Sequence, residues 1–472
     1  MSESTHDWIV EFSTTNNVDV VCIDFSRAFD SIVFSKLLAK FEHYGLNGKL
    51  LNFISAFLHK RGQSVALENN FSSIAAVLSG VPQGLVLGPL LFLVFINDVS
   101  SVCIGKTNLK LFADDVKLYT SFKIDESNCC SLQKSIDLLS SWSNARELAI
   151  NISKCCVLPI RNRYNSSVSH PYFINGTQLV QSTSVSDLGI LVDSRLSFNL
   201  HISNILTKAT QRSGVFFRGF VSRQFAFVGK TIITYIRPLL EYNSNIWNPT
   251  KKHLIDKLEN IQRRFTKRIP SISHLSYLER LSVLELESLE LRRLHFDLIQ
   301  YYKILNNLTS LQPDLYFKFN YPPVSSRKPS PYLKKPSNFN NCLQSSFFYR
   351  CIDCWNALPE SLKLSSSLIQ FKHDIKSIDF SGFLKGRVFN VFLIFNFNSN
   401  NYVFALRLYI YNTCLCLVEP FIFVVYFYFL FFIFYFIYFY FYFLRYHFSM
   451  LSISVNLWHL VFQLILWILY TE

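Results

Sequence analysis

The sequence predicts an α+β fold, in which an antiparallel sheet with helices is followed by a helical region and a hydrophobic tail. An apolar run at 18–25 (VDVVCIDF) ends in a carboxylate, and residues 109–119 (LKLFADDVKLY) alternate around an acidic turn. Apolar residues recur at helical spacing from about 200 to 307. Long stretches after residue 386 carry no charge at all. We therefore expect a mixed domain, then helices, then a segment without globular character.

The mixed domain is expected to alternate strands and helices. Residues 18–25 form a buried strand with a polar tip, and 109–119 form two short strands that meet at a tight turn. Helical spacing covers 33–59, with a break near Gly45 and Gly48, and a further helix is expected at 131–150. An apolar stretch runs over 85–96, and two or three short strands are expected within 172–192.

In the region after residue 200, Leu254, Leu258, Ile261, Phe265 and Ile269 recur at steps of three and four. The segment 277–305 repeats this pattern. Residues 308–345 are rich in Pro, Ser and Asn, which predicts a linker.

Charge points to an anionic partner. The 472 residues leave room for two or three domains, and the whole formal charge of +14 belongs to residues 1–387. A basic globular part suggests nucleic acid, although many unrelated soluble proteins are also basic.

The cysteines do not resemble a secreted disulfide framework. There are 11 of them, partly in adjacent pairs, and we find no N-terminal signal peptide, so we expect a reducing compartment. Cys351 and Cys354 form a single CxxC without a second pair at metal-ligand spacing. We expect these two cysteines to be structural.

The tail allows two interpretations. Segments 421–444 and 451–470 are uncharged and long enough to span a bilayer, so membrane association is one of them. However, membrane helices are seldom so dense in Phe and Tyr, and these residues have AT-rich codons. We favour translated flanking DNA over an evolved membrane anchor.

Three motifs carry the candidate chemistry, in the order DFSRAFD (24–30), SGVPQG (79–84) and FADD (112–115). Taken alone, each has an ordinary explanation, because Asp favours turns and strand ends. Together they place Asp24 at the end of one buried strand and Asp114 and Asp115 at the turn of a neighbouring hairpin. Carboxylates gathered in this way raise each other's pKa, and divalent cations remove that penalty. Mg²⁺ prefers a few carboxylates plus phosphate oxygens, which suits two-metal nucleotidyl transfer.

The motifs and their order resemble those of the reverse transcriptases of non-LTR (LINE-type) retrotransposons. The resemblance continues through Trp142, Leu148, Asn151 and Lys154, the DLGI segment at 187–190, and further segments up to about residue 375. It implies a right-hand polymerase palm in residues 1–195 and a helical thumb in 196–307. A linker with a C-terminal family segment would follow in 308–385, and the hydrophobic tail would occupy 386–472.

The resemblance also implies roles for single residues. Asp24 and Asp114 would be the main metal ligands and Asp115 a secondary one, with Mg²⁺ as the metal and Mn²⁺ as an alternative. Phe29 would be the steric gate that selects deoxynucleotides, with a core phenylalanine as the alternative. The nucleotide and template pocket would be lined by Gln83 and Gly84. Lys154 would protonate the leaving pyrophosphate, unless it is an ordinary surface lysine.

A basic stretch near the end of the segment 258–269 completes the predicted site. Its side chains would follow the phosphates of an RNA–DNA hybrid, or else form a solvated helix face. They are Arg263, Arg264, Lys267 and Arg268.

The implied function is RNA-directed DNA synthesis, with an RNA template, a DNA primer and deoxynucleoside triphosphates as partners.

Leu85 stands where the family usually has serine. The match begins shortly before Asp24, so we expect an N-terminally truncated member without most of the fingers that does not polymerise alone. The alternatives are an inactive relic that only binds nucleic acid and a membrane-associated protein. The family implies a nucleus or cytoplasm location, and the tail a membrane.

Overall fold

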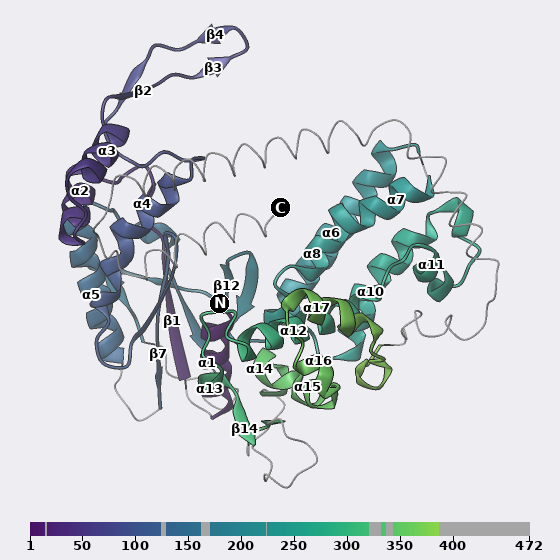
Figure 1. Cartoon of the computed structure of the whole chain (residues 1–472). Coiled ribbons are helices and arrows are strands. Elements are labelled where there is room, and N and C mark those ends of the chain that lie inside the picture. The colour runs from purple at the N-terminus through teal and green to yellow at the C-terminus, as the bar shows by residue number, and fades with distance from the viewer. Residues whose placement is uncertain are drawn as a thin grey trace. The chain divides into compact units, whose positions relative to one another are not determined.

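The computed structural model describes residues 1–14, 17–123, 129–161, 170–222, 224–320, 332–336 and 343–386. Within this part, the chain is a mixed fold of sheet and helix (Figure 1).

A five-stranded sheet forms the framework of the first part of the chain. Its order is β11 (Val180–Gln181), β8 (Cys156–Ile160), β1 (Asn17–Ile23), β7 (Asp115–Phe122) and β6 (Asn108–Phe112). β1 is antiparallel to both β7 and β8, and β7 is antiparallel to β6. The expected strand at 18–25 and the expected hairpin at 109–119 are therefore both confirmed. Burial on both faces explains why β1 is almost continuously apolar.

Three helices cover one face of this sheet (Figure 1): α2 (Phe34–His43), α4 (Leu87–Ile96) and α5 (Cys129–Arg146). Val21, Ile23 and Leu118 pack there against the apolar sides of these helices. α3 (Lys49–Leu58) follows α2 after Gly45 and Gly48, as the helical spacing predicts. The 3₁₀ helix η1 (Asn97–Val102) continues α4.

The other face packs on α1 (Ser2–Ser13), a helix that the sequence analysis did not predict. Trp8 and Ile9 of α1 lie in one apolar core with Val18 and Val20 of β1. Asp7 accepts a hydrogen bond from the Tyr119 hydroxyl at 2.6 Å. The same core extends to α6 (Asn199–Gly219).

Short strands connect the sheet to α6. They include two hairpins, β9 (Phe173–Ile174) with β10 (Thr177–Gln178), and β12 (Ser184–Asp187) with β13 (Ile190–Asp193). The Asp193 carboxylate accepts backbone hydrogen bonds from Arg195, Ser197 and Phe198, and so organises the turn into α6.

The helical prediction from residue 200 onward is also confirmed. Leu254, Leu258, Ile261 and Phe265 form the buried side of α10. Ser276 and Glu279 form a capping box at the start of α11, so both residues satisfy backbone groups there. The elements after α6 are α7 (Phe225–Thr231), the π-helix η3 (Ile232–Ile236), α8 (Arg237–Glu241), α9 (Ser244–Trp247), α10 (Lys252–Lys267), η4 (Pro270–Ile272), α11 (Tyr277–Val283) and α12 (Leu289–Leu305).

The region expected to be a linker contributes buried residues to a core in the part that the structure describes. Tyr316, Phe317 and Leu333 are buried in a third core against α12, because aromatic residues between the polar ones supply enough apolar area. Cys351 and Cys354 are buried in the same core as free thiols. The elements are α13 (Pro313–Tyr316), β14 (Lys318–Asn320), β15 (Tyr332–Lys334), η5 (Leu343–Ser345), α14 (Phe347–Arg350), α15 (Ile352–Ala357), α16 (Glu360–Lys363), α17 (Leu368–Asp374), η6 (Ile375–Ser377) and η7 (Ser381–Phe383).

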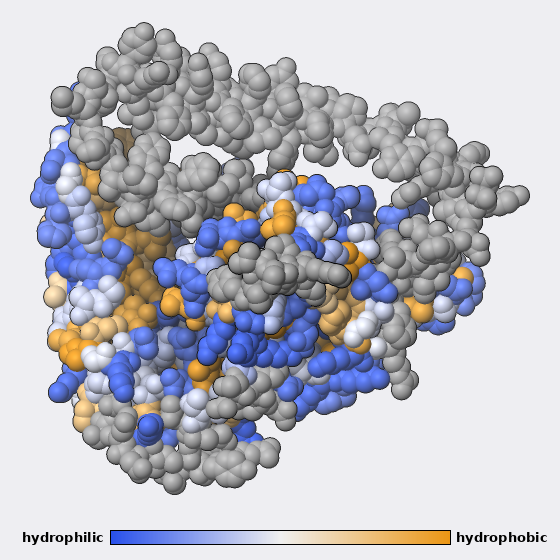
Figure 2. Space-filling model, turned by 60° about the horizontal axis from the view of Figure 1, so that its bottom comes forward, coloured by the Kyte–Doolittle hydropathy of each residue, from blue (hydrophilic) through white to orange (hydrophobic). Residues whose placement is uncertain are grey.

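A narrow arm extends from the end of α3 (Figure 1). β2 (Arg61–Gln63) pairs with β5 (Ala75–Val77) at its base, and β3 (Ala66–Leu67) pairs with β4 (Asn70–Phe71) near its tip. Its apolar side chains are largely exposed: Val65, Leu67, Phe71, Ile74 and Leu78. On the face shown in Figure 2, the coloured surface is mainly hydrophilic, with hydrophobic patches between.

The two segments considered as membrane spans, 421–444 and 451–470, lie outside the described residues. Among the helices that the structure does describe, none combines the length and the apolar character needed to cross a bilayer.

Candidate active site

Three carboxylates lie at one end of the central sheet. Ile23 pairs with Val116, so Asp24 and Asp115, the next residues outward, follow at the same end of β1 and β7. Phe112 pairs with Asp115, which leaves Ala113 and Asp114 as the turn of the β6–β7 hairpin. Ala113 has a φ of 51°, the left-handed conformation that such a tight turn requires. The structure thus brings Asp24 of DFSRAFD and both aspartates of FADD to the same end of the sheet.

The backbone at Asp24 is held from a second segment. Asn151 donates its N–H to the Asp24 carbonyl at 2.8 Å, and the Asp24 N–H donates to the Cys155 Sγ at 3.4 Å. Lys154 lies between these residues, and its Nζ is 3.6 Å from Asp24 Oδ2. The Lys154 side chain is 67% exposed, so it is free to move relative to the carboxylate. The segment with Asn151 and Lys154 therefore fixes the position of Asp24.

Negative charge at the sheet end is only partly compensated. Partial desolvation and the nearby charges of Asp114 and Asp187 raise the pKa of Asp115 above its usual range. Behind it on β7, Lys117 is almost fully buried and pairs with Asp187 of β12 at 2.6 Å. Because Lys117 is already paired, it offers little compensation to the carboxylates at the edge.

These residues fit a divalent cation that also binds phosphate. Asp24 Oδ2 is buried without a hydrogen-bond partner in the described structure. Such an oxygen is costly to leave unsatisfied, and a cation would satisfy it. Within the described ranges, no group of three or more His, Cys, Asp or Glu residues is arranged as a complete metal site. A small set of carboxylates completed by substrate oxygens is the arrangement that Mg²⁺ prefers.

The SGVPQG loop docks directly on the DFSRAFD turn. Gly80 donates its N–H to the Ile32 carbonyl, and Val81 donates to the Phe29 carbonyl at 2.8 Å. Gly80 has a φ of +82°, and a Cβ there would come within 2.6 Å of the Asp30 backbone. No other residue type fits this position without displacing the turn. Two motifs separated by about fifty residues of sequence are thus packed into one unit.

Phe29, Gln83 and Gly84 lie in this unit. The half-buried ring of Phe29 stacks on Phe92, with 4.2 Å between the ring centroids. Gln83 donates to Asp30 Oδ1 at 3.0 Å, and Gly84 has a φ of +79° with open space where a Cβ would stand. Their predicted contacts with a nucleotide remain predictions, because the structure contains no ligand.

The four basic residues predicted to bind nucleic acid lie at the end and C-cap of α10, on two different sides of the helix. Arg263 donates to Asn260 and lies over the Tyr277 ring, and Lys267 donates to the Ser273 carbonyl at 2.6 Å. Arg264 and Arg268 instead line a hollow between α6 and α10. Two of the four residues predicted to bind nucleic acid, Arg263 and Lys267, therefore donate hydrogen bonds within the protein.

Sequence reasoning missed the Lys117–Asp187 pair. Asp187 belongs to the DLGI segment, which was noticed as a family motif without a role for its acid. Leu188 and Gly189 have φ values of 45° and 81°, so they form the tight turn of the antiparallel hairpin between β12 and β13. The signal was a lysine between the apolar residues Val116 and Leu118 of a strand, since a buried lysine needs a partner.

Comparison with known proteins places these motifs in a family. Residues 2–192 match the reverse transcriptase (RNA-dependent DNA polymerase) family. This part of the chain is therefore a reverse transcriptase domain. The relatives of this reverse transcriptase domain include the RNA-directed DNA polymerase from the mobile element jockey of Drosophila melanogaster, which is 28% identical over 260 residues. Another is the probable RNA-directed DNA polymerase from the transposon BS of the same species, which is 27% identical over 281 residues.

These relatives confirm the non-LTR (LINE-type) assignment made from the motifs. The alignments cover 52% and 55% of this chain but only 28% and 29% of the relatives, so the chain spans less than a third of their length. Among solved structures, telomerase from Candida albicans in complex with a fragment of telomeric RNA is 13% identical. That match covers 60% of this chain and 52% of the telomerase chain, with a TM-score of 0.32.

Proposed function

We propose that this chain synthesises DNA on an RNA template by two-metal nucleotidyl transfer at the end of the central sheet. The observation that carries the proposal is the meeting of Asp24, Asp114 and Asp115 at one sheet end, within the part of the chain that matches the reverse transcriptase family. Reverse transcriptases generally use divalent metal ions. We propose Mg²⁺, with Mn²⁺ as an alternative.

Asp24 and Asp114 would hold the metal ions, and Asp115 would add negative charge beside them. Asp24 contributes an oxygen that has no hydrogen-bond partner in the described structure, and its backbone is fixed by Asn151. When bound, the metal ions would supply Lewis-acid activation of the primer hydroxyl and stabilise charge on the leaving group. Lys154 is within 3.6 Å of Asp24, so its ammonium group is close enough to give a proton to a pyrophosphate bound there.

The docked loops would position the nucleotide. Phe29 would stand under the sugar and exclude a ribose 2′-hydroxyl, because its ring is fixed by stacking on Phe92. Gln83 and Gly84 are exposed on the loop that docks on the same turn, which supports their assignment to the nucleotide and template pocket.

The domain proposal follows from this assignment. Residues 1–195 would be the palm and 196–307 the thumb, with RNA template, DNA primer and deoxynucleoside triphosphates as partners. Of the four basic residues predicted to bind nucleic acid, Arg264 and Arg268 line the hollow between α6 and α10, where they can meet phosphate groups of RNA outside the hybrid.

Primer extension by the full chain tests the proposal. With Mg²⁺, dTTP and oligo(dT) on poly(A), the proposed function predicts extension, whereas the sequence-based expectation that the chain does not polymerise alone predicts none. Asp114→Asn should lower any extension by about 10³-fold, because an amide is a much weaker metal ligand than a carboxylate. Hybrid binding should stay the same in this variant. Asp137→Asn is the matched control, since Asp137 is exposed on α5 and bonds only to Gln133 by its side chain.

The outcomes separate the alternatives. Undiminished extension by Asp114→Asn would refute the metal assignment. Tight hybrid binding by the wild-type chain without any extension would instead favour a nucleic-acid-binding relic.

A further inference from the structure

The hollow between α6 and α10 has the chemistry of a nucleotide site. We name it the arginine hollow, and it has a volume of about 670 Å³. We propose that the arginine hollow binds an unpaired nucleotide of single-stranded RNA, separately from the track that holds the hybrid. The proposal rests on the RNA-templated function proposed above, and it adds a second binding site for the same RNA.

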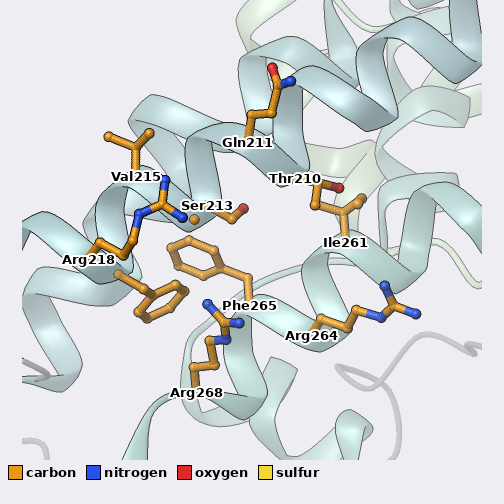
Figure 3. Close-up of a pocket in the computed structure, with 11 residues that line it drawn as sticks. Thr210, Gln211, Ser213, Val215, Arg218, Ile261, Arg264, Phe265 and Arg268 are labelled. Carbon is orange, nitrogen blue, oxygen red and sulfur yellow. The ribbon is translucent and has the colours of Figure 1, made fainter.

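Three guanidinium groups leave the hollow strongly positive. Arg218 comes from α6, Arg264 from α10 and Arg268 from the C-cap of α10 (Figure 3). Arg218 and Arg264 make no hydrogen bond or ion pair with the described residues, and none of the residues that line the hollow there is acidic. Several arginines gathered without a carboxylate repel one another, and an anion with several oxygens removes this cost.

Aromatic rings form the wall between the charges. Phe217 and Phe265 line the hollow, with 4.8 Å between their ring centroids, and Arg268 lies over the Phe217 ring at 4.8 Å. Figure 3 shows Arg218 and Arg268 near the Phe265 ring, with Arg264 and Ile261 at the other end of the hollow. A base can stack on a ring or a guanidinium plane while its phosphates meet the neighbouring arginines. The hollow thus offers both contacts that an unpaired nucleotide needs.

A glycine in the middle of α6 keeps the hollow open. Gly214 lines it, although glycine within a helix costs about 1 kcal/mol relative to alanine. A Cβ at this position would stand 3.4 Å from Arg218 Nη1, and any longer side chain would enter the space that the guanidinium occupies. Gly214 therefore preserves room for Arg218 and a ligand at the expense of helix propensity.

Single-stranded RNA fits these features better than a duplex or a peptide. The bases of a hybrid are stacked on each other, so a duplex would offer only its phosphates and leave the rings unused. An acidic peptide would meet the arginines but carries no flat ring for the aromatic wall. An unpaired nucleotide uses both parts of the arginine hollow.

Fluorescence anisotropy with the full chain tests the inference. The probes are labelled oligo(U) RNA, the same RNA annealed to oligo(dA), and labelled oligoglutamate, all in EDTA so that the metal site does not contribute. We expect Arg268→Met, Phe217→Leu and Gly214→Leu each to weaken binding of the single strand by about tenfold and to change hybrid binding by less than about twofold. Gly214→Leu is informative because it raises helix propensity and removes no charge.

Matched controls are Lys208→Ala on α6 and Lys257→Ala on α10, which remove one exposed charge each from the same helices outside the hollow. Equal losses for single strand and hybrid, equal losses with the lysine controls, or unchanged single-strand binding would each overturn the proposal. Binding of oligoglutamate that is as tight and as sensitive to these variants would also overturn it. Absence of primer extension with intact, hollow-dependent RNA binding would count against the proposed function and leave this inference standing.

Discussion

The sheet end and the arginine hollow resemble each other with the signs of charge reversed. At the sheet end, Asp24, Asp114 and Asp115 bring negative charge together, and Asp24 Oδ2 has no hydrogen-bond partner in the described structure, only the exposed Lys154 ammonium group at 3.6 Å. At the hollow, arginines from two helices bring positive charge together without a carboxylate among the lining residues described. Each region keeps like charges close at a cost in stability, which a ligand of opposite charge would offset.

Buried charges in other parts of the fold are treated differently. Asp297 accepts two hydrogen bonds from the Arg350 guanidinium, at 2.7 and 2.8 Å. Asp19, in the middle of β1, pairs with Arg161 and accepts from the Tyr172 hydroxyl. The comparison teaches that the buried carboxylates Asp297 and Asp19 are paired within the fold, whereas the charges of the two candidate sites are at most partly compensated there.

The first prediction compares how the loss of a paired carboxylate, Asp187, and of a carboxylate at the sheet end, Asp115, changes the free energy of unfolding. Asp187→Asn leaves Lys117 buried and charged without a partner, so it should lower the free energy of unfolding by about 3–5 kcal/mol. Asp115→Asn should have the opposite sign, because the raised pKa of Asp115 shows that its ionised form is disfavoured in the folded state. Urea unfolding followed by tryptophan fluorescence measures both changes at neutral pH.

Glu147→Gln is the control, because its ion pair with Lys36 is exposed and should contribute at most about 1 kcal/mol. Equal destabilisation by Asp187→Asn and Asp115→Asn would remove the distinction between structural and site charges.

The second prediction extends the comparison to a group that is buried without charge. His6 of α1 lies against the rings of Tyr316, Phe348 and Tyr349, and burial lowers its pKa to about 4. Above pH ~6.5, the usual pKa of histidine, His6 is neutral in both states and its contribution to stability is fully present. As the pH falls from there toward ~4, protonation of the unfolded state alone should remove about 2–3 kcal/mol.

Unfolding curves at neutral and mildly acidic pH check this, with His6→Phe as the variant and His43→Phe as an exposed control. His6→Phe should lose less stability on acidification than the wild type by that amount. The same acid sensitivity in both would show that His6 does not control it.

The third prediction concerns a ring that both packs and, by our proposal, meets the substrate. Phe29→Val should relieve the clash with a ribose 2′-hydroxyl and raise the use of UTP relative to dTTP by roughly tenfold. Single-nucleotide primer extension measures the ratio. Phe92→Leu, which removes the stacking partner, separates the two roles. A preference that shifts equally in both variants, or in neither, would identify Phe29 as a packing residue only.

Local pattern was enough to predict the elements that build the sheet end. The apolar run before Asp24 and the alternation around Asp114 are properties of neighbouring residues, and the hairpin needs only a tight turn. α1 was missed because its helix is short and stabilised by long-range contacts of Trp8 and His6 rather than by a strong pattern of its own.

Features that depend on packing between distant segments could not be predicted from local sequence pattern. The Lys117–Asp187 pair requires knowing that β12 lies beside β7. The division of the basic residues of α10 depends on α11 on one side and α6 on the other, so Arg263 and Arg268 look equivalent in sequence but differ in the fold. The packed aromatic residues Tyr316 and Phe317 were hidden within a composition typical of linkers.

The β2–β5 pairing at the base of the exposed arm determines how well the arm tolerates insertions and deletions. Arg61 pairs with Val77 and also donates to the Gly80 carbonyl at 3.1 Å, so the two ends of the arm are joined before the chain reaches the SGVPQG loop. Loop-closure entropy grows only slowly with length, by about 0.6 kcal/mol for each doubling. Insertions and deletions in the arm are therefore nearly neutral for the sheet end, and over generations this stretch is free to lengthen, shorten or acquire new sequence while the docked motifs stay in register.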